Sequence, residues 1–139
     1  MADDGGSIRV RTRHAELNLE EIASLLPGTG EVMASVARSF GSAWHAADRG
    51  NWELAAYFVR RVRSQLRALA VVRPRYREPI QAFQEEALTP LLDAIGRRDR
   101  AAFDLAYDAA VERADQYHAE TGHPYIRWRR PPHPPETFA

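Results

Sequence analysis

Residues 51–72 read NWELAAYFVRRVRSQLRALAVV, and this stretch carries the most regular helical pattern in the chain. Its apolar side chains recur every three or four positions, as one face of a helix in a bundle requires. The inward positions are Trp52, Ala55, Val59, Val62, Leu66 and Leu69. Asn51 is a good N-cap, and Pro74 ends the pattern. The stretch therefore predicts one long amphipathic helix.

Three further long helical patterns surround this one, and they cover residues 29–49, 78–96 and 99–121. Gly50 closes the first of them, and Asp99 is an N-cap for the last. Pro90 lies inside the middle pattern, where it should kink the helix because proline lacks an N–H and crowds the preceding turn. The connections are short and no segment is rich in strand signals. The sequence therefore predicts an all-α protein, an antiparallel up-down-up-down four-helix bundle.

Both ends of the chain differ from the helical region. Residues 1–17 are polar and aperiodic, which predicts a flexible N-terminal arm. Asn18 and Glu21 form a capping-box pattern that begins a short helix ending near Leu26. The bundle is expected over residues 18–121, and the Pro-rich residues 122–139 should form an extended tail. The apolar residues expected to pin this tail to the bundle are Tyr125, Ile126 and Trp128.

The composition excludes several kinds of chemistry. The chain of 139 residues has no cysteine, which excludes disulfides, thiolate catalysis and thioether attachment of haem. All 19 basic residues are arginine, so a Schiff-base lysine and a P-loop lysine are also excluded. The 19 acidic residues balance this charge, and no recognition motif is present, which argues against nucleic-acid binding. With no signal peptide or membrane span in the pattern, a cytoplasmic location is expected.

The last helical pattern carries the most informative polar residue, His118. Its apolar stripe runs Tyr107, Val111, Ala114, His118, so the imidazole should face the core. In an antiparallel bundle one end would bring together a layer that consists of Met33, Val36, Leu66, Leu69, Ile80, Phe83, Ala114 and His118. A thioether and an imidazole that face each other in an apolar layer are suitable axial ligands for haem iron. A core histidine held by a hydrogen bond, with methionine as filler, is the competing interpretation.

From Gly50 to Trp128 the chain resembles four-helix-bundle c-type cytochromes of cytochrome c′-like architecture. The similar segments are GNWELAAY (50–57), the spacing of Asp99, Phe103 and Tyr107, and YHAETGHPYIRWRRP (117–131). In that group the last helix carries C-x-x-C-H. Here the same frame reads Ala114, Asp115, Gln116, Tyr117, His118, so the histidine remains and both cysteines are replaced.

The resemblance implies a core site in which His118 is the metal ligand. Any haem would be non-covalent, held by fit and by coordination alone. The residues expected around this haem, or around another apolar ligand, are His118, Met33, Ala114, Tyr117, Val36, Leu66 and Phe83. The alternative is an interaction or structural protein that has lost its cofactor. Because cytochrome c′-like bundles pair through their first two helices, the resemblance also implies a homodimer. An enzyme that uses Tyr117, His118 and His123 ranks last, because no nucleophile can be named.

Two other features of the sequence allow more than one interpretation. Seven arginines and one glutamate lie in residues 51–77, and they could contact phosphate, a haem propionate or an acidic partner. The acidic residues of the last helix could instead neutralise them as a neighbouring helix. His45 lies beside Trp44 and is expected at the surface, as is His133 in the tail.

Overall fold

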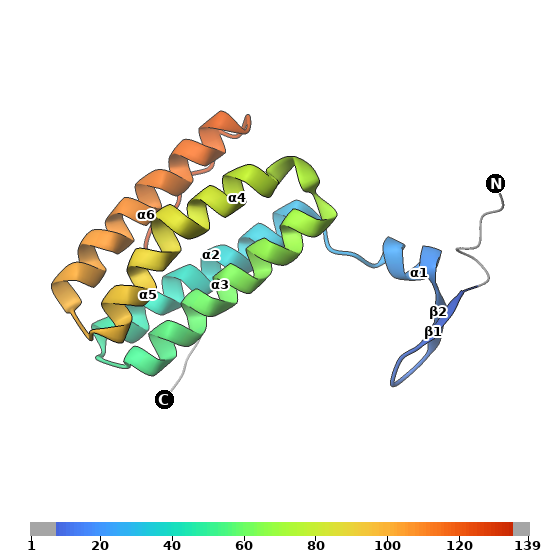
Figure 1. The fold of residues 1–139 in the computed structure, drawn as a ribbon, viewed down its shortest axis with the longest axis horizontal. Helices are drawn as coiled ribbons and strands as arrows, with labels where there is room; N and C mark the ends of the chain where they lie inside the picture. The colour runs from blue at the N-terminus through green and yellow to red at the C-terminus, as the bar shows by residue number, and fades with distance from the viewer. Residues whose placement is uncertain (1–7, 135–139) are drawn as a thin grey trace. The chain divides into compact units, whose positions relative to one another are not determined.

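In the computed structural model, residues 8–134 are described and the protein is mostly helical (Figure 1). The parts of the predicted arm and tail at residues 1–7 and 135–139 lie outside the described residues. The chain divides into two compact units, Met1–Glu31 and Val32–Ala139. Within residues 8–134, no helix combines the length and the apolar character that crossing a bilayer requires.

The first unit contains a small antiparallel hairpin where the sequence predicts an aperiodic arm. Strands β1 (Arg9–Arg11) and β2 (Glu16–Asn18) pair with Val10 opposite Leu17. The Thr12 backbone N–H and hydroxyl both donate to the Ala15 carbonyl, and these bonds close the turn. Helix α1 (Leu19–Ser24) follows, and the predicted capping box between Asn18 and Glu21 is present. Cross-strand pairing thus stabilises a hairpin in residues whose sequence alone gives only weak strand signals.

The second unit contains the long helical patterns at nearly the predicted bounds. These elements are α2 (Thr29–Asp48, which begins just before the unit boundary), α3 (Trp52–Val72), the 3₁₀ turn η1 (Pro74–Tyr76), α4 (Arg77–Phe83), the π-turn η2 (Gln84–Leu88), α5 (Thr89–Gly96) and α6 (Arg100–Glu120). In Figure 1, α4, η2 and α5 follow one another as a continuous helical rod. Helix α3 packs against α4 and α5, and α6 packs against α4, η2 and α5.

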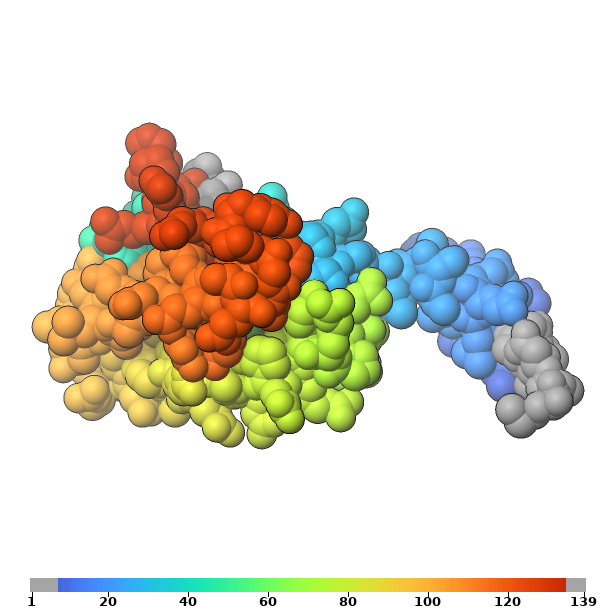
Figure 2. Space-filling model, turned by 90° about the horizontal axis from the view of Figure 1, so that it is seen from above, coloured from blue at the N-terminus to red at the C-terminus, as the bar shows by residue number. Residues whose placement is uncertain are grey.

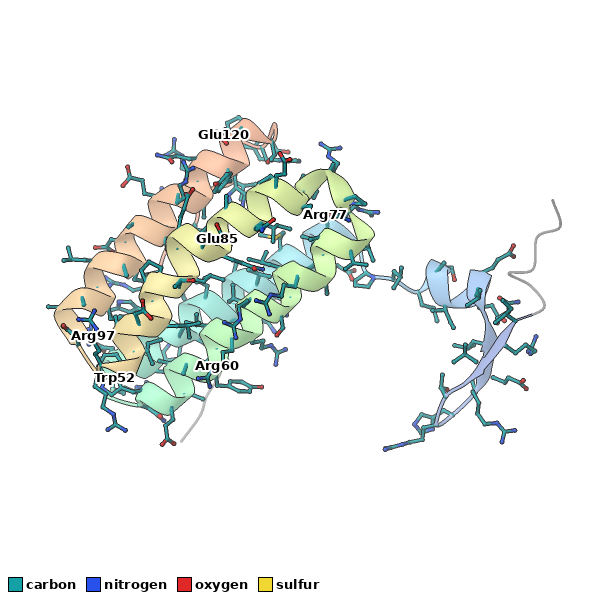
Figure 3. The ribbon with its side chains drawn as sticks, viewed as in Figure 1. Trp52, Arg60, Arg77, Glu85, Arg97 and Glu120 are labelled. Carbon is teal, nitrogen blue, oxygen red and sulfur yellow. The ribbon has the colours of Figure 1, made fainter. Side chains whose placement is uncertain are left out.

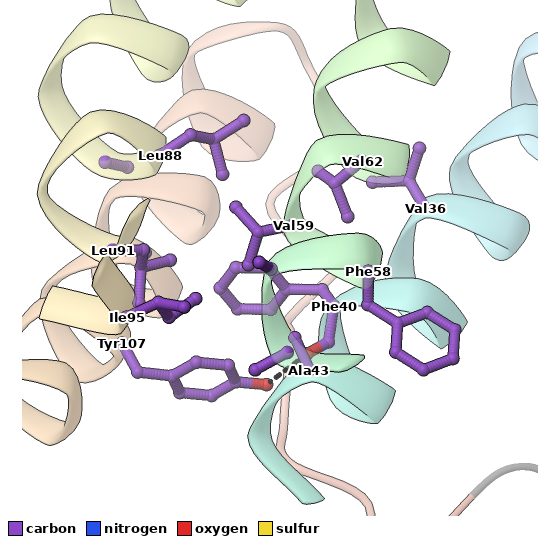
Figure 4. Close-up of a cluster of buried hydrophobic side chains, with 14 of the residues drawn as sticks. Val36, Phe40, Ala43, Phe58, Val59, Val62, Leu88, Leu91, Ile95 and Tyr107 are labelled. Carbon is purple, nitrogen blue, oxygen red and sulfur yellow. Dashed lines mark hydrogen bonds between the residues drawn. The ribbon is translucent and has the colours of Figure 1, made fainter. Parts of the chain in front are cut away.

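Helix α2 is joined to the core by hydrogen bonds from side chains of α3 and α6. The Gln65 amide of α3 donates to the Ser35 hydroxyl at 2.6 Å. The Tyr107 hydroxyl of α6 donates to the Phe40 carbonyl at 3.1 Å (Figure 4). One contiguous apolar core results, and its most completely buried apolar side chains include Val36, Val59, Val62, Leu88, Leu91 and Phe103.

The two short interhelical turns share one geometry. After α2, the Asn51 N–H donates to the Ala46 carbonyl and Gly50 has φ +73°, which is a Schellman ending. After α5, the Asp99 N–H donates to the Ala94 carbonyl in the same way. The left-handed position is here filled by Arg98, with φ +53°. Asn51 and Asp99 then cap the next helices, as predicted.

The disturbance expected at Pro90 takes the form of a wide helical turn. The Thr89 N–H donates to the Gln84 carbonyl, five residues back, and the Thr89 hydroxyl also donates to it at 3.2 Å. A regular α-turn would require an N–H at Pro90 and would press its ring against the carbonyl four residues earlier. The π-turn removes that conflict, and the buried stripe continues from Phe83 to Leu91.

Candidate functional site

The end of α6 turns the chain back over the helices. Gly122 has φ +88°, and its N–H donates to the Ala119 carbonyl at 3.2 Å. The His123 N–H donates to the His118 carbonyl at 2.7 Å. These bonds form another Schellman ending, which only a residue tolerant of positive φ makes without strain. The tail therefore leaves α6 in a defined direction, beside His118.

Trp128 of the tail lies among aromatic side chains of three different elements. Its indole centroid is 5.0 Å from the ring of Phe40, 6.3 Å from Phe83 and 5.8 Å from His118. Its backbone N–H donates to the Asp115 carboxylate at 2.8 Å, which anchors the tail to α6. We call the group Phe40, Phe83, His118 and Trp128 the aromatic site. It is the place where a core histidine meets the tail.

The imidazole of His118 is only partly buried, but one of its nitrogens is enclosed. Its Nδ1 is buried without a hydrogen-bond partner among the described residues. Burial lowers the pKa of His118, because desolvation disfavours the charged ring; the carboxylate of Asp115 and a backbone hydrogen bond with Ile126 oppose this effect. The ring is therefore biased toward the neutral form, in which one nitrogen keeps a lone pair.

The tail continues from Trp128 along α2. The ring Nε2 of His45 lies 2.8 Å from the Pro131 carbonyl oxygen, and the Arg130 guanidinium stands 3.9 Å above the Trp44 ring. His45 is only 7% exposed, so the prediction that it lies at the surface is wrong: the tail, which is distant in sequence, helps to cover it. His133 is exposed, as predicted.

Only one of the three predicted tail anchors holds the tail to the core. Trp128 packs against it, whereas Tyr125 is 77% exposed and Ile126 is 39% exposed. A turn in which the Ile126 N–H donates to the His123 carbonyl lies between the helix end and Trp128. Tyr125 and Ile126 therefore connect α6 to Trp128 and do not anchor the tail.

The residues predicted to line a ligand site fall into two groups. Val36, Leu66, Phe83 and Ala114 are buried in the same core cluster. Met33 and Tyr117 are partly buried against it. The Tyr117 hydroxyl accepts a hydrogen bond from Arg113 at 3.1 Å, and its ring lies 6.4 Å from Phe83.

Helical periodicity does not identify the roles of two residues of the aromatic site, Phe40 and Trp128, or of Asp115, which anchors the tail beside it. Phe40 lies on the correct stripe, but its sequence position does not show that it meets the tail. Asp115 lies on the polar face of α6, where a carboxylate is ordinary. Trp128 carries a usable signal, since a tryptophan inside a Pro-rich segment must find apolar cover somewhere.

The arrangement offers one imidazole but no cluster of metal ligands. Among residues 8–134, no three His, Asp or Glu side chains lie close enough to hold a metal ion together. Nδ1 of His118, which is buried without a hydrogen-bond partner in this part of the chain, is a nitrogen whose chemistry would suit haem iron. The indole of Trp128 stands beside the same ring, so a porphyrin in the aromatic site would have to displace it.

No protein-family model, curated protein or solved structure matches the chain significantly.

Proposed function

We propose that the chain is a four-helix, up-down-up-down bundle of cytochrome c′-like architecture that acts without a cofactor, as a self-associating interaction protein of the cytoplasm. The observation that carries this proposal is the position of Trp128 against Phe40, Phe83 and His118. A flat aromatic side chain of the protein itself takes the place beside the histidine that a flat ligand would need.

The helix connections support the bundle. The turn after α2 and the turn after α5 are short Schellman endings followed directly by an N-cap, a geometry that reverses the chain between neighbouring helices. The 3₁₀ turn η1 joins α3 to α4, and α3 packs against both elements. Helices joined in this way run antiparallel.

The energetics support a core that is complete without a ligand. Removing a buried tryptophan costs on the order of 3–5 kcal/mol, and somewhat less where the side chain is partly exposed. A ligand in the aromatic site would first have to supply that energy and break the bond between the Trp128 N–H and Asp115. Three aromatic contacts and this hydrogen bond therefore oppose displacement of Trp128 from the aromatic site.

A haem titration tests the cofactor-free state. Hemin is added to the native chain, to His118→Ala, to Trp128→Ala and to Trp128→Ala/His118→Ala, and the Soret band is followed. We expect no His118-dependent band with the native chain. A stoichiometric Soret band with the native chain, lost in His118→Ala, would overturn the proposal.

A second candidate function is non-covalent binding of haem or another flat apolar ligand after Trp128 moves out. The buried, unpartnered Nδ1 of His118 is the observation in its favour, since such an atom costs free energy until it finds a partner. Under this candidate, Trp128→Ala binds hemin more tightly than the native chain, and the double variant loses the gain. The candidate fails if Trp128→Ala, shown to be folded by circular dichroism, binds no better.

A further inference from the structure

One face of α3 is basic and open. The side chains Tyr57, Arg60, Arg61, Ser64, Arg67 and Val71 recur every three or four positions and are all exposed. We call them the basic α3 face. Glu53 is the one carboxylate on this stripe, at its N-terminal end. Within residues 8–134, Arg60, Arg61 and Arg67 form no ion pair with any carboxylate.

One face of α6 has the opposite charge and the same spacing. Its exposed side chains are Leu105, Asp108, Glu112 and Gln116, which we call the acidic α6 face. No arginine lies on this stripe. Of the two arginines of α6, Arg100 pairs with Asp48 and Asp104, whereas Arg113 pairs with Glu86 and donates to the Gln116 amide oxygen at 2.7 Å. Figure 2 views the molecule from the α6 side, and the orange part of this helix is open to solvent.

The two faces do not neutralise each other within one molecule. Helices α3 and α6 both pack against the rod of α4, η2 and α5. Figure 3 shows Arg60 on α3 and Glu120 at the end of α6, with that rod between the two helices. The described ion pairs of α6 join its arginines to Asp48, Asp104 and Glu86, and none of these pairs reaches α3.

Charge complementarity favours a second copy of this chain as the partner. The 19 arginines balance the 19 carboxylates overall, yet the two open faces carry unlike charge. A symmetric α3–α3 contact would place arginine against arginine, which is repulsive. Exposed apolar side chains accompany the charges on both sides: Tyr57 is 53% exposed, Val71 74% and Leu105 75%. They provide the apolar contact that charge alone does not supply.

We propose that the basic α3 face of one copy docks on the acidic α6 face of the next. This inference rests on the proposed self-association and names its surfaces. Because the two faces differ and lie on helices that the rod of α4, η2 and α5 separates, we expect a heterologous contact, which produces a closed ring or an open chain rather than a symmetric dimer.

Two charge-reversal variants test the pairing. One is Arg60→Glu/Arg61→Glu/Arg67→Glu, and the other is Asp108→Arg/Glu112→Arg. Sedimentation velocity is measured for the native chain and each variant at low and high salt. The native chain should associate at low salt and dissociate at high salt. Each variant alone should sediment as a monomer, and an equimolar mixture should associate again because opposite faces are restored in both directions.

A matched control reverses two exposed arginines of the tail, Arg127→Glu/Arg129→Glu, and should associate like the native chain. Circular dichroism confirms that all variants remain helical. If either α3 or α6 variant associates as the native chain does, or if the mixture stays monomeric, the pairing is wrong although self-association stands. If the native chain is a monomer at low salt and high concentration, the proposed self-association fails as well.

Discussion

The Tyr107 hydroxyl donates a hydrogen bond to the backbone carbonyl of Phe40, at 3.1 Å, and the two rings stack 4.4 Å apart. The residues are 67 positions apart in sequence. The contact joins α6 to α2 inside the core, and Phe40 continues it to Trp128 of the tail at 5.0 Å. One pair of residues thus connects two helices and positions one wall of the aromatic site.

Tyr107→Phe should separate the hydrogen bond from the stacking. The variant keeps the ring, so we expect the free energy of unfolding to fall by about 1 kcal/mol, the usual net contribution of one buried hydrogen bond. Urea denaturation followed by circular dichroism measures the change. Tyr57→Phe is the control, because Tyr57 is 53% exposed and should give no change. Equal values for the two variants would contradict the importance of the bond.

High pH should destabilise the protein through the same tyrosine. Burial raises the pKa of Tyr107 above its ordinary value, because the phenolate is poorly solvated in the core. Its contribution to stability is complete below the unfolded-state pKa near 10. Above that pH the unfolded chain loses a proton that the folded chain keeps, so stability should fall by up to about 1.4 kcal/mol per pH unit. Tyr107→Phe should show a shallower decline in urea melts between pH 9.5 and 11.

Arg98→Gly should stabilise the turn between α5 and α6. Arg98 has φ +53°, a left-handed conformation that costs an L-residue about 1 kcal/mol and that glycine adopts freely. We expect a gain of roughly 0.5–1 kcal/mol in the free energy of unfolding. The opposite change, Gly50→Ala, should cost a similar amount, because Gly50 holds the equivalent position at φ +73°. Changes of the same sign in both variants would refute the shared geometry of the two turns.

Asp115→Ala should release the tail. The carboxylate accepts the Trp128 N–H at 2.8 Å, and a charge-assisted bond of this kind contributes roughly 1.5–3 kcal/mol. Tryptophan fluorescence should shift to the red, and the tail should become more sensitive to protease. Asp93→Ala, at an exposed position of α5, is the control. Identical fluorescence and digestion in both variants would rule out the anchor.

Acid should act through His118. The pKa of this imidazole is lowered, mainly by burial, so the folded chain favours the neutral ring. The stability it contributes is present above the unfolded-state pKa near 6.5 and is lost as pH falls below it. Urea melts at pH 7.5 and pH 5 should show a smaller acid loss in His118→Phe than in the native chain. A second test is NMR titration of the ring, which should report a pKa below the ordinary histidine value.

Most of the helical structure can be predicted from local signals. Asn51 and Asp99 each accept the expected backbone N–H, since an N-cap depends only on residues three positions away. The burial of Val36, Leu66, Phe83 and Ala114 follows from helical periodicity. The sequence predicts that Pro90 disturbs the helix, but it does not predict a π-turn. The kind of turn depends on keeping the apolar stripes on both sides of it in the core.

The candidate site is predicted only in part. Periodicity places His118 beside the core, and the structure agrees that it lies there partly buried. Periodicity does not predict that Trp128 lies against the His118 imidazole or that Pro131 lies against His45. These contacts join residues 10 and 86 positions apart through an irregular tail. No repeating pattern describes such a tail, so its path depends on the surface it meets.

The sequence by itself determines the long helices, their caps and their inward stripes, because 3.6-residue periodicity and capping chemistry act within a few residues. It also excludes thiolate and lysine chemistry, because those residues are absent. Only the tertiary structure decides what stands beside His118. Gly122 sets the direction in which the chain leaves α6, and the burial of one indole against Phe40 and Phe83 decides where the tail comes to rest.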